Sequence, residues 1–125
     1  MAKILIIDDD ETIHLIGRAY LGKAGYEVQT AFDGPEGLEK AAAFNPDLVL
    51  LDINMPKMSG FDVAKKLREN AGTKHIPIFI MTSLKQDSNI QRGYGLGIDD
   101  YITKPTNMAH LKLKIDKFLE KHKRP

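Results

Sequence analysis

Residues 48–60 read LVLLDINMPKMSG, and residues 4–11 read ILIIDDDE. Each stretch begins with four consecutive aliphatic residues and then reaches an aspartate; the aliphatic run is typical of a strand buried on both faces of a parallel sheet. A similar apolar run covers Ile76–Met81, and weaker ones cover Tyr26–Thr30 and Tyr101–Thr103. Together these runs predict five short strands.

The segments between the apolar runs have helical periodicity. We expect the helices to bury the following apolar sets, each on one face: Ile13, Ile16, Tyr20 and Leu21; Leu38, Ala41 and Ala42; Phe61, Ala64 and Leu67; Leu111, Ile115, Phe118 and Leu119. Asp10 and Thr106 are the expected caps of the first and last helices, and Pro35 opens the second. Residues 84–94 form the least periodic of the five expected helices.

A strand followed by a helix, five times over, predicts one doubly wound α/β domain of the (βα)5 type. Right-handed crossovers place helices on both faces of its parallel sheet. The chain has 125 residues, which is enough to bury a core of this kind. We assign residues 1–120 to the domain and residues 121–125 to a basic tail, which is most simply a solvated helix end.

Composition excludes several classes of protein. The chain has no cysteine, which rules out disulfides and thiolate zinc sites. A net charge of +1 argues against a nucleic-acid or membrane partner. The apolar run Ile4–Ile7 is too short for a signal-peptide core, and no stretch reaches the ~20 apolar residues of a membrane span. We therefore expect a soluble, cytoplasmic protein.

Chemistry in a sheet of this kind gathers beyond the carboxyl ends of the strands. Asp8 and Asp9 follow the first strand, Asp52 the third, Thr82 the fourth and Lys104 the fifth. Each residue alone is most simply a cap, a turn residue or a surface charge, but together they predict one cleft. Its carboxylates repel one another, and Mg²⁺ with a lysine would relieve that repulsion. The four histidines His14, His75, His110 and His122 share no such site, and we expect all four at the surface.

A cleft with these groups suits phosphoryl transfer. A carboxylate can attack phosphorus and form an aspartyl phosphate. Metal, lysine and hydroxyl groups then neutralise the charge on the transferred oxygens.

Four segments, at residues 4–11, 48–60, 76–83 and 97–105, resemble the receiver domain of bacterial response regulators, the CheY-like group. The resemblance implies a flavodoxin-like fold with strand order 2-1-3-4-5. It also implies a signalling switch rather than an enzyme, one that assists only its own phosphorylation and dephosphorylation. A histidine kinase or a histidine phosphotransfer protein would be the donor. The output would be another protein or a fused domain, without direct nucleic-acid binding by this domain.

The resemblance assigns a role to each residue of the cleft. Asp52 would be the phosphoacceptor. Asp9 and Asp52 would bind Mg²⁺ directly, Asp8 through water, and Asn54 through its backbone carbonyl. Lys104 would pair with the phosphoryl group.

Further roles concern the switch and the loops around the acceptor. Thr82 would hydrogen-bond the phosphoryl group and move with Tyr101, which changes rotamer. These two would switch a surface made by residues 84–94, the fifth strand and the last helix. Pro105 would follow a cis peptide bond, and Pro56 and Gly60 would shape the loop after the acceptor. Thr106 departs from the family, in which phenylalanine often follows the proline, and both a stand-alone regulator and part of a longer protein fit the sequence.

An alternative is a phosphohydrolase of the haloacid-dehalogenase type. Residues 8–12, DDDET, fit its D-x-D-x-T pattern and would make Asp8 the nucleophile. Against this, Lys104 follows the acidic pair at residues 99–100 rather than preceding it, and Asp52 would have no role. The glycine-rich residues 93–97 do not spell a nucleotide-binding motif.

Two expectations concern exchange of the phosphoryl group. In-line transfer places the donor on a rim formed by Asp10, Glu11, His14, Met55 and Pro105. Leu84, two residues after Thr82, either excludes the hydrolytic water and prolongs the phosphoryl lifetime or only makes an apolar contact at the start of a helix.

Overall fold

The computed structural model describes residues 2–82, 95–104 and 107–122. Its elements in chain order are β1 (Lys3–Ile7), α1 (Glu11–Lys23), β2 (Glu27–Ala31), α2 (Gly34–Phe44), β3 (Leu48–Asp52), α3 (Gly60–Glu69), β4 (Ile78–Thr82), β5 (Asp100–Thr103) and α5 (Met108–Lys121). The helix expected over residues 84–94 lies outside the described residues, as do Leu84, Pro105 and Thr106.

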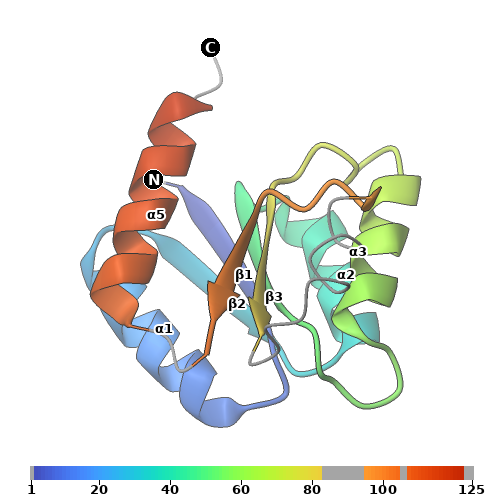
Figure 1. The fold of residues 1–125 in the computed structure, drawn as a ribbon, viewed down its shortest axis with the longest axis horizontal. Coiled ribbons are helices and arrows are strands. Elements are labelled where there is room, and N and C mark those ends of the chain that lie inside the picture. The colour runs from blue at the N-terminus through green and yellow to red at the C-terminus, as the bar shows by residue number, and fades with distance from the viewer. Residues whose placement is uncertain (1, 83–94, 105–106, 123–125) are drawn as a thin grey trace.

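All five predicted strands are present and form one parallel sheet in the order β2-β1-β3-β4-β5, which confirms the predicted fold (Figure 1). Ile7 of β1 pairs with both Ala31 of β2 and Leu51 of β3. On the other side of β3, Asp52 pairs with Met81. The carboxyl ends of the strands therefore lie level along one edge of the sheet, which is the geometry the predicted cleft requires.

Two apolar cores, one on each face of the sheet, account for the continuous hydrophobic runs. Alternate strand residues point to opposite faces, so Leu5 and Ile7 pack with α2 and α3, whereas Ile4 and Ile6 pack with α1 and α5. Figure 1 shows this arrangement, with α1 and α5 on one side of the sheet and α2 and α3 on the other. A strand covered on both sides has no polar face, hence the unbroken LVLL of β3.

The buried face of α1 differs from the prediction. Leu21 is buried as expected, but Ile16 is 46% exposed and Tyr20 is 39% exposed. The helix instead packs through Gly17, where a Cβ atom would lie 2.6 Å from Cδ1 of Ile6. This glycine allows α1 to approach the sheet closely. In the resulting orientation of the helix, Ile16 and Tyr20 point toward solvent.

Helix starts follow the sequence signals with one correction. The Asp10 side chain accepts a hydrogen bond from the Thr12 N–H at 2.9 Å and caps α1, as predicted. The cap of α5 is Asn107 rather than Thr106, because the Asn107 side chain accepts from the His110 N–H at 3.1 Å. Among the described residues, no helix is both long and apolar enough to cross a membrane.

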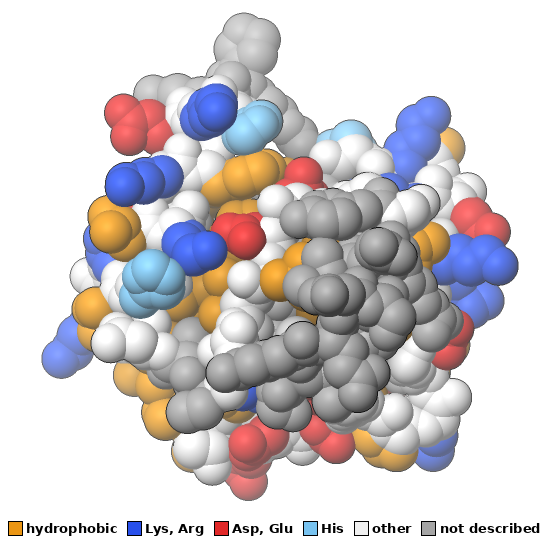
Figure 2. All heavy atoms as spheres, viewed as in Figure 1, with side chains coloured by type: hydrophobic (Ala, Val, Ile, Leu, Met, Phe, Trp, Pro, Cys, Tyr) orange, Lys and Arg blue, Asp and Glu red, His pale blue; other side chains and the backbone are white. Residues whose placement is uncertain are grey.

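The outer face of α5 is basic. Lysines occur along its whole length, at positions 112, 114, 117 and 121. Figure 2 shows blue and pale blue side chains gathered over this helix, with hydrophobic ones between them. Two of the lysines are paired with acids, since Lys114 lies 3.2 Å from Asp100 and Lys112 lies 2.5 Å from Asp116.

Candidate functional site

Three carboxylates meet at the carboxyl edge of the sheet. Asp8 follows β1 and is fully buried, Asp52 ends β3 and is only 3% exposed, and Asp9 faces solvent. One carboxylate oxygen from each residue lies within 4.8 Å of the others. The structure thus brings together the acids that the sequence placed at the ends of two neighbouring strands.

Backbone hydrogen bonds hold the two buried acids in place. Asp8 donates its N–H to the Ala31 carbonyl at 3.0 Å, which fixes the end of β1 against β2. Its Oδ1 accepts from the Asp10 N–H at 2.9 Å. Oδ1 of Asp52 accepts from the Asn54 N–H at 3.3 Å. These local bonds orient both carboxylates toward the same space.

Lys104 enters the site from the end of β5. Its Nζ lies 2.9 Å from Oδ2 of Asp8 and 3.3 Å from Oδ1 of Asp52. Its backbone N–H donates to the Thr82 carbonyl at 2.9 Å, which anchors the residue to β4. Burial alone would lower the pKa of the Lys104 amine, but the hydrogen bond and charge of Asp8, followed by those of Asp52, outweigh it and raise the pKa. The amine is therefore a firmly protonated cation between two acids.

The surroundings of Asp52, the candidate phosphoacceptor, disfavour its negative charge. Burial, followed by the nearby charge of Asp8, raises the pKa of Asp52 from 3.8 to about 6. The Lys104 ammonium and the Asn54 N–H oppose this rise without cancelling it. One lysine does not fully balance the buried acids, so the donor set of three carboxylates fits a hard divalent cation such as Mg²⁺.

The loop after Asp52 is closely packed against the backbone of the acceptor. A Cβ atom at Gly60 would lie 2.3 Å from the Asp52 carbonyl oxygen. The Gly60 N–H donates to the Ile53 carbonyl at 2.9 Å, and the Met58 N–H donates to the Pro56 carbonyl at 2.7 Å. Only glycine fits at position 60, which agrees with the expected role of Gly60 and Pro56 in shaping this loop.

Thr82 and Tyr101, the predicted switch pair, lie on the neighbouring strands β4 and β5. Thr82 ends β4 and is 4% exposed. Tyr101 of β5 is half-buried and packs against the core on the α2–α3 side. Asn54 is exposed beside Asp52, with its N–H bonded to that carboxylate.

One histidine was predicted wrongly. His14 is 3% exposed rather than at the surface, and its ring lies 4.4 Å from the ring of Phe32 between centroids. The other three histidines are exposed, as expected. The error has the same origin as that for Ile16, because the rotation of α1 that exposes the isoleucine turns His14 inward. Phe32 directly follows β2, and the residue pattern gives no indication that its side chain contacts His14.

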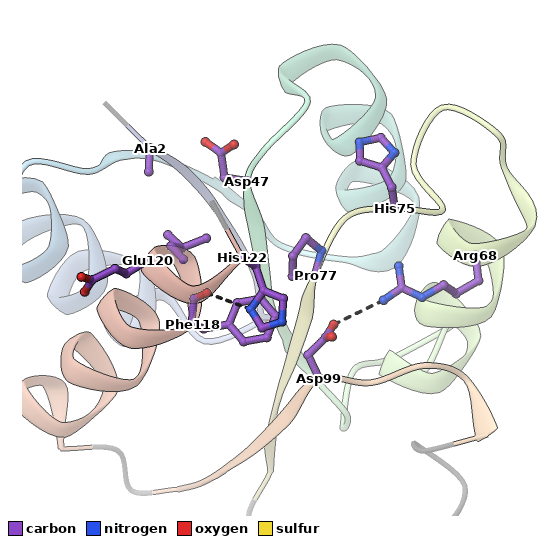
Figure 3. Close-up of a pocket in the computed structure, with 10 residues that line it drawn as sticks. Ala2, Asp47, Arg68, His75, Pro77, Asp99, Phe118, Glu120 and His122 are labelled. Atoms are coloured by element: carbon purple, nitrogen blue, oxygen red, sulfur yellow. Dashed lines mark hydrogen bonds and ion pairs between the residues drawn. The ribbon is translucent and has the colours of Figure 1, made fainter. Parts of the chain in front are cut away.

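A cavity of about 780 Å³ lies at the opposite end of the sheet (Figure 3). Its lining includes Asp47, Pro77 and Asp99, which precede β3, β4 and β5. Arg68 and Asp99 in this cavity are already paired, since Arg68 donates to the carbonyls of Lys74, Ile76 and Gly97 and lies 3.5 Å from Asp99. This end stabilises the fold, and the reactive groups are at the other end.

Comparison with known proteins identifies the family of the chain. Residues 4–116 match the family model of the response regulator receiver domain. The chain is 39% identical over 121 residues to the DNA-binding dual master transcriptional regulator RpaA of Synechocystis, covering 97% of this chain and 50% of that protein. It is 37% identical over 119 residues to the alkaline phosphatase synthesis transcriptional regulatory protein PhoP of Bacillus subtilis, covering 95% and 49%.

Solved structures give the same result. The chemotaxis response regulator CheY4 of Vibrio cholerae, crystallised at low pH, superposes with a TM-score of 0.89 at 36% identity, covering 94% of this chain and 98% of that chain. A two-component response regulator from Clostridium difficile gives a TM-score of 0.92 at 30% identity, covering 99% and 100%.

The chain belongs to the response regulator receiver domain family. Its role is that of a phosphoacceptor in two-component signalling. The family match does not support the haloacid-dehalogenase alternative, in which Asp8 is the nucleophile. The chain spans about half the length of the first curated relatives that it matches.

Proposed function

We propose that Asp52 is the residue that takes the phosphoryl group, from a phosphohistidine of a sensor kinase or a phosphotransfer protein. An Asp52 carboxylate oxygen forms a bond to phosphorus while the bond from phosphorus to the donor imidazole nitrogen breaks. The electron pair of that bond returns to the nitrogen. The observation that carries this assignment is that Asp52 ends β3, the middle strand of the sheet, 3.3 Å from Lys104 and within 4.8 Å of the other two acids.

The surrounding side chains have distinct tasks in this reaction. Asp52 must be ionised to attack, and with a pKa of about 6 it is largely ionised at pH 7 and above. Lys104, already held between two acids, neutralises charge on the transferred oxygens. Thr82 ends the neighbouring strand and supplies a hydroxyl to the same group.

Mg²⁺ fits the acidic cluster as the cofactor of this reaction. Asp9 and Asp52 would hold it directly, Asp8 through water, and Asn54 through its backbone carbonyl. When bound, the ion would supply positive charge against the phosphoryl oxygens. The support is the donor set itself, three clustered carboxylates among which burial and the charge of Asp8 raise the pKa of Asp52.

Phosphorylation would change the output surface made by residues 84–94, β5 and α5. Thr82 would move toward the phosphoryl group, and Tyr101 would turn inward, biasing an equilibrium between two states. Tyr101 is half-buried on β5, directly beside β4, so a change at Thr82 has a short path to it.

The donor would dock on the α1 side of the site. In-line transfer requires an approach over the carboxyl edge of the sheet. Among the described residues near that edge, Leu15 is 64% exposed, Ile16 is 46% exposed and Phe32 is 48% exposed. These apolar side chains, rather than a surface histidine, would form the contact with the donor.

The wider assignments follow from this role. Residues 1–120 form the receiver unit and residues 121–125 a basic tail. The unit is a cytoplasmic signalling switch, and its output is a separate protein or a fused domain. DNA binding, named for the relative RpaA, would belong to a separate output domain and not to this unit.

Locating the phosphoryl group tests the proposal. Wild type, Asp52→Asn and Asp8→Asn are incubated with acetyl phosphate and Mg²⁺, and the product is reduced with borohydride and mapped by peptide mass. We expect labelling at Asp52 and no labelling in Asp52→Asn. Label at Asp8 in wild type or in Asp52→Asn would overturn the assignment. A panel of purified kinases with the same readout then identifies the donor.

A further inference from the structure

His14 is a buried histidine without a hydrogen bond in the described part of the chain. It is 3% exposed, and both ring nitrogens are shielded from solvent and meet no hydrogen-bond partner there. Buried polar groups are nearly always paired, because leaving one unpaired costs stability. A leucine at this position would fill a similar space without that cost, so the imidazole requires an explanation.

The His14 ring packs against Phe32, an aromatic side chain that is itself partly exposed to solvent. The Phe32 ring lies 4.4 Å from the His14 ring between centroids, tilted by 48°. Phe32 is nevertheless 48% exposed, which is unusual for a phenylalanine. Moving this side chain would expose less apolar surface than moving a fully buried phenylalanine.

Both residues border the phosphoacceptor site. Phe32 directly follows Ala31, whose carbonyl accepts the Asp8 N–H at 3.0 Å. His14 lies on the second turn of α1, next to Leu15, which is 64% exposed. A protein that reaches Asp52 over this edge would therefore meet Phe32 and Leu15, with His14 in contact with the Phe32 ring.

We propose that His14 is a concealed hydrogen-bonding group of the donor-docking surface. Phe32 moves aside when the phosphohistidine-bearing protein docks, and a polar group of that protein then pairs with the His14 imidazole. The inference rests on the proposed function, in that the docking partner is the phosphodonor. It gives the unpaired imidazole a partner in the complex, and it makes docking selective, because a donor without that polar group would leave His14 unpaired.

The test compares His14→Leu, which keeps bulk and removes hydrogen bonding, with His14→Gln, which keeps a donor and an acceptor. His75→Leu is the matched control, because His75 is exposed at the opposite end of the sheet. Each protein is melted alone. Each is then phosphorylated by acetyl phosphate and by the kinase that the panel identifies, and the ratio of the two rates is compared with that of wild type.

In the free protein, His14→Leu is expected to raise the melting temperature by roughly 3–8 °C, because it removes the unpaired buried group. The rate ratio of kinase to acetyl phosphate is expected to fall about tenfold in His14→Leu and to stay within about threefold of wild type in His14→Gln. The control should show neither change.

Two results would overturn the inference. A lower melting temperature for His14→Leu would mean that the imidazole already makes a stabilising bond in the free protein. An unchanged rate ratio in His14→Leu would mean that the donor does not use it. If acetyl phosphate failed to label Asp52 in wild type, the proposed function would fail instead, so the two failures are distinguishable.

Discussion

Replacing Asp52 by asparagine should stabilise the metal-free protein. Asparagine has nearly the same shape as aspartate but cannot ionise. The folded state raises the pKa of Asp52 from 3.8 to about 6, so keeping this side chain charged in the fold is unfavourable. A difference of roughly two pKa units corresponds to about 3 kcal/mol, which is an upper limit for the gain in the free energy of unfolding.

The sign of the pH dependence follows from proton binding. Between pH 3.8 and about 6, the folded protein retains a proton on Asp52 that the unfolded chain has lost. The stability of wild type therefore falls as pH rises through this window. The advantage of Asp52→Asn should be complete above about pH 7 and should vanish near pH 4.

The assay is thermal unfolding in EDTA at a series of pH values. A gain of about 3 kcal/mol corresponds to roughly 10 °C in melting temperature for a domain of this size. Glu39→Gln serves as the control, because it removes one negative charge from an exposed position on α2 and should change stability by less than ~0.5 kcal/mol.

Adding Mg²⁺ should reduce the difference between wild type and Asp52→Asn, since binding stabilises the protein that retains the carboxylate. The reasoning fails if Asp52→Asn is no more stable than wild type at pH 7.5 in EDTA while the control is neutral. It also fails if the difference between the two proteins does not change between pH 4 and pH 7.

Three substitutions and one structural comparison test other parts of the site. Asp9→Ala should weaken Mg²⁺ binding by about tenfold or more, as measured by titration calorimetry, and unchanged affinity would exclude this carboxylate as a ligand. Lys104→Met should lower the free energy of unfolding by about 3 kcal/mol in urea at pH 7.5, because it leaves Asp8 buried and unpaired; a neutral effect would contradict the ion pair. Gly60→Ala should destabilise by at least ~2 kcal/mol in the same assay, since the new Cβ would lie 2.3 Å from the Asp52 carbonyl oxygen, and a stable variant would refute the tight contact. Tyr101 should change rotamer between crystals with and without a beryllofluoride mimic of the phosphoryl group, and one rotamer in both would refute the switch.

The sequence by itself determined the fold and the place of the site. Continuous apolar runs such as LVLL predict strands buried on both faces, and their alternation with helical segments predicts a parallel sheet. Parallel strands end at one edge, so Asp8, Asp52 and Lys104 had to lie near one another once the strands were recognised. Strand order needed more than periodicity, and it came from the resemblance of four segments to a known family.

Only the tertiary structure decided how individual groups are paired and buried. Residue spacing cannot show that Lys104 lies between Asp8 and Asp52, or that burial makes Asp52 a weaker acid. These properties depend on distances between elements that are far apart in the chain.

The rotation of α1 is the clearest case. Its apolar residues predicted that Ile16 would be buried, and the polarity of His14 predicted a surface position. In the structure the helix packs through Gly17 against Ile6, where any larger side chain would collide. Close packing of the backbone against the sheet therefore set the orientation of the helix, and it placed His14 inside and Ile16 outside.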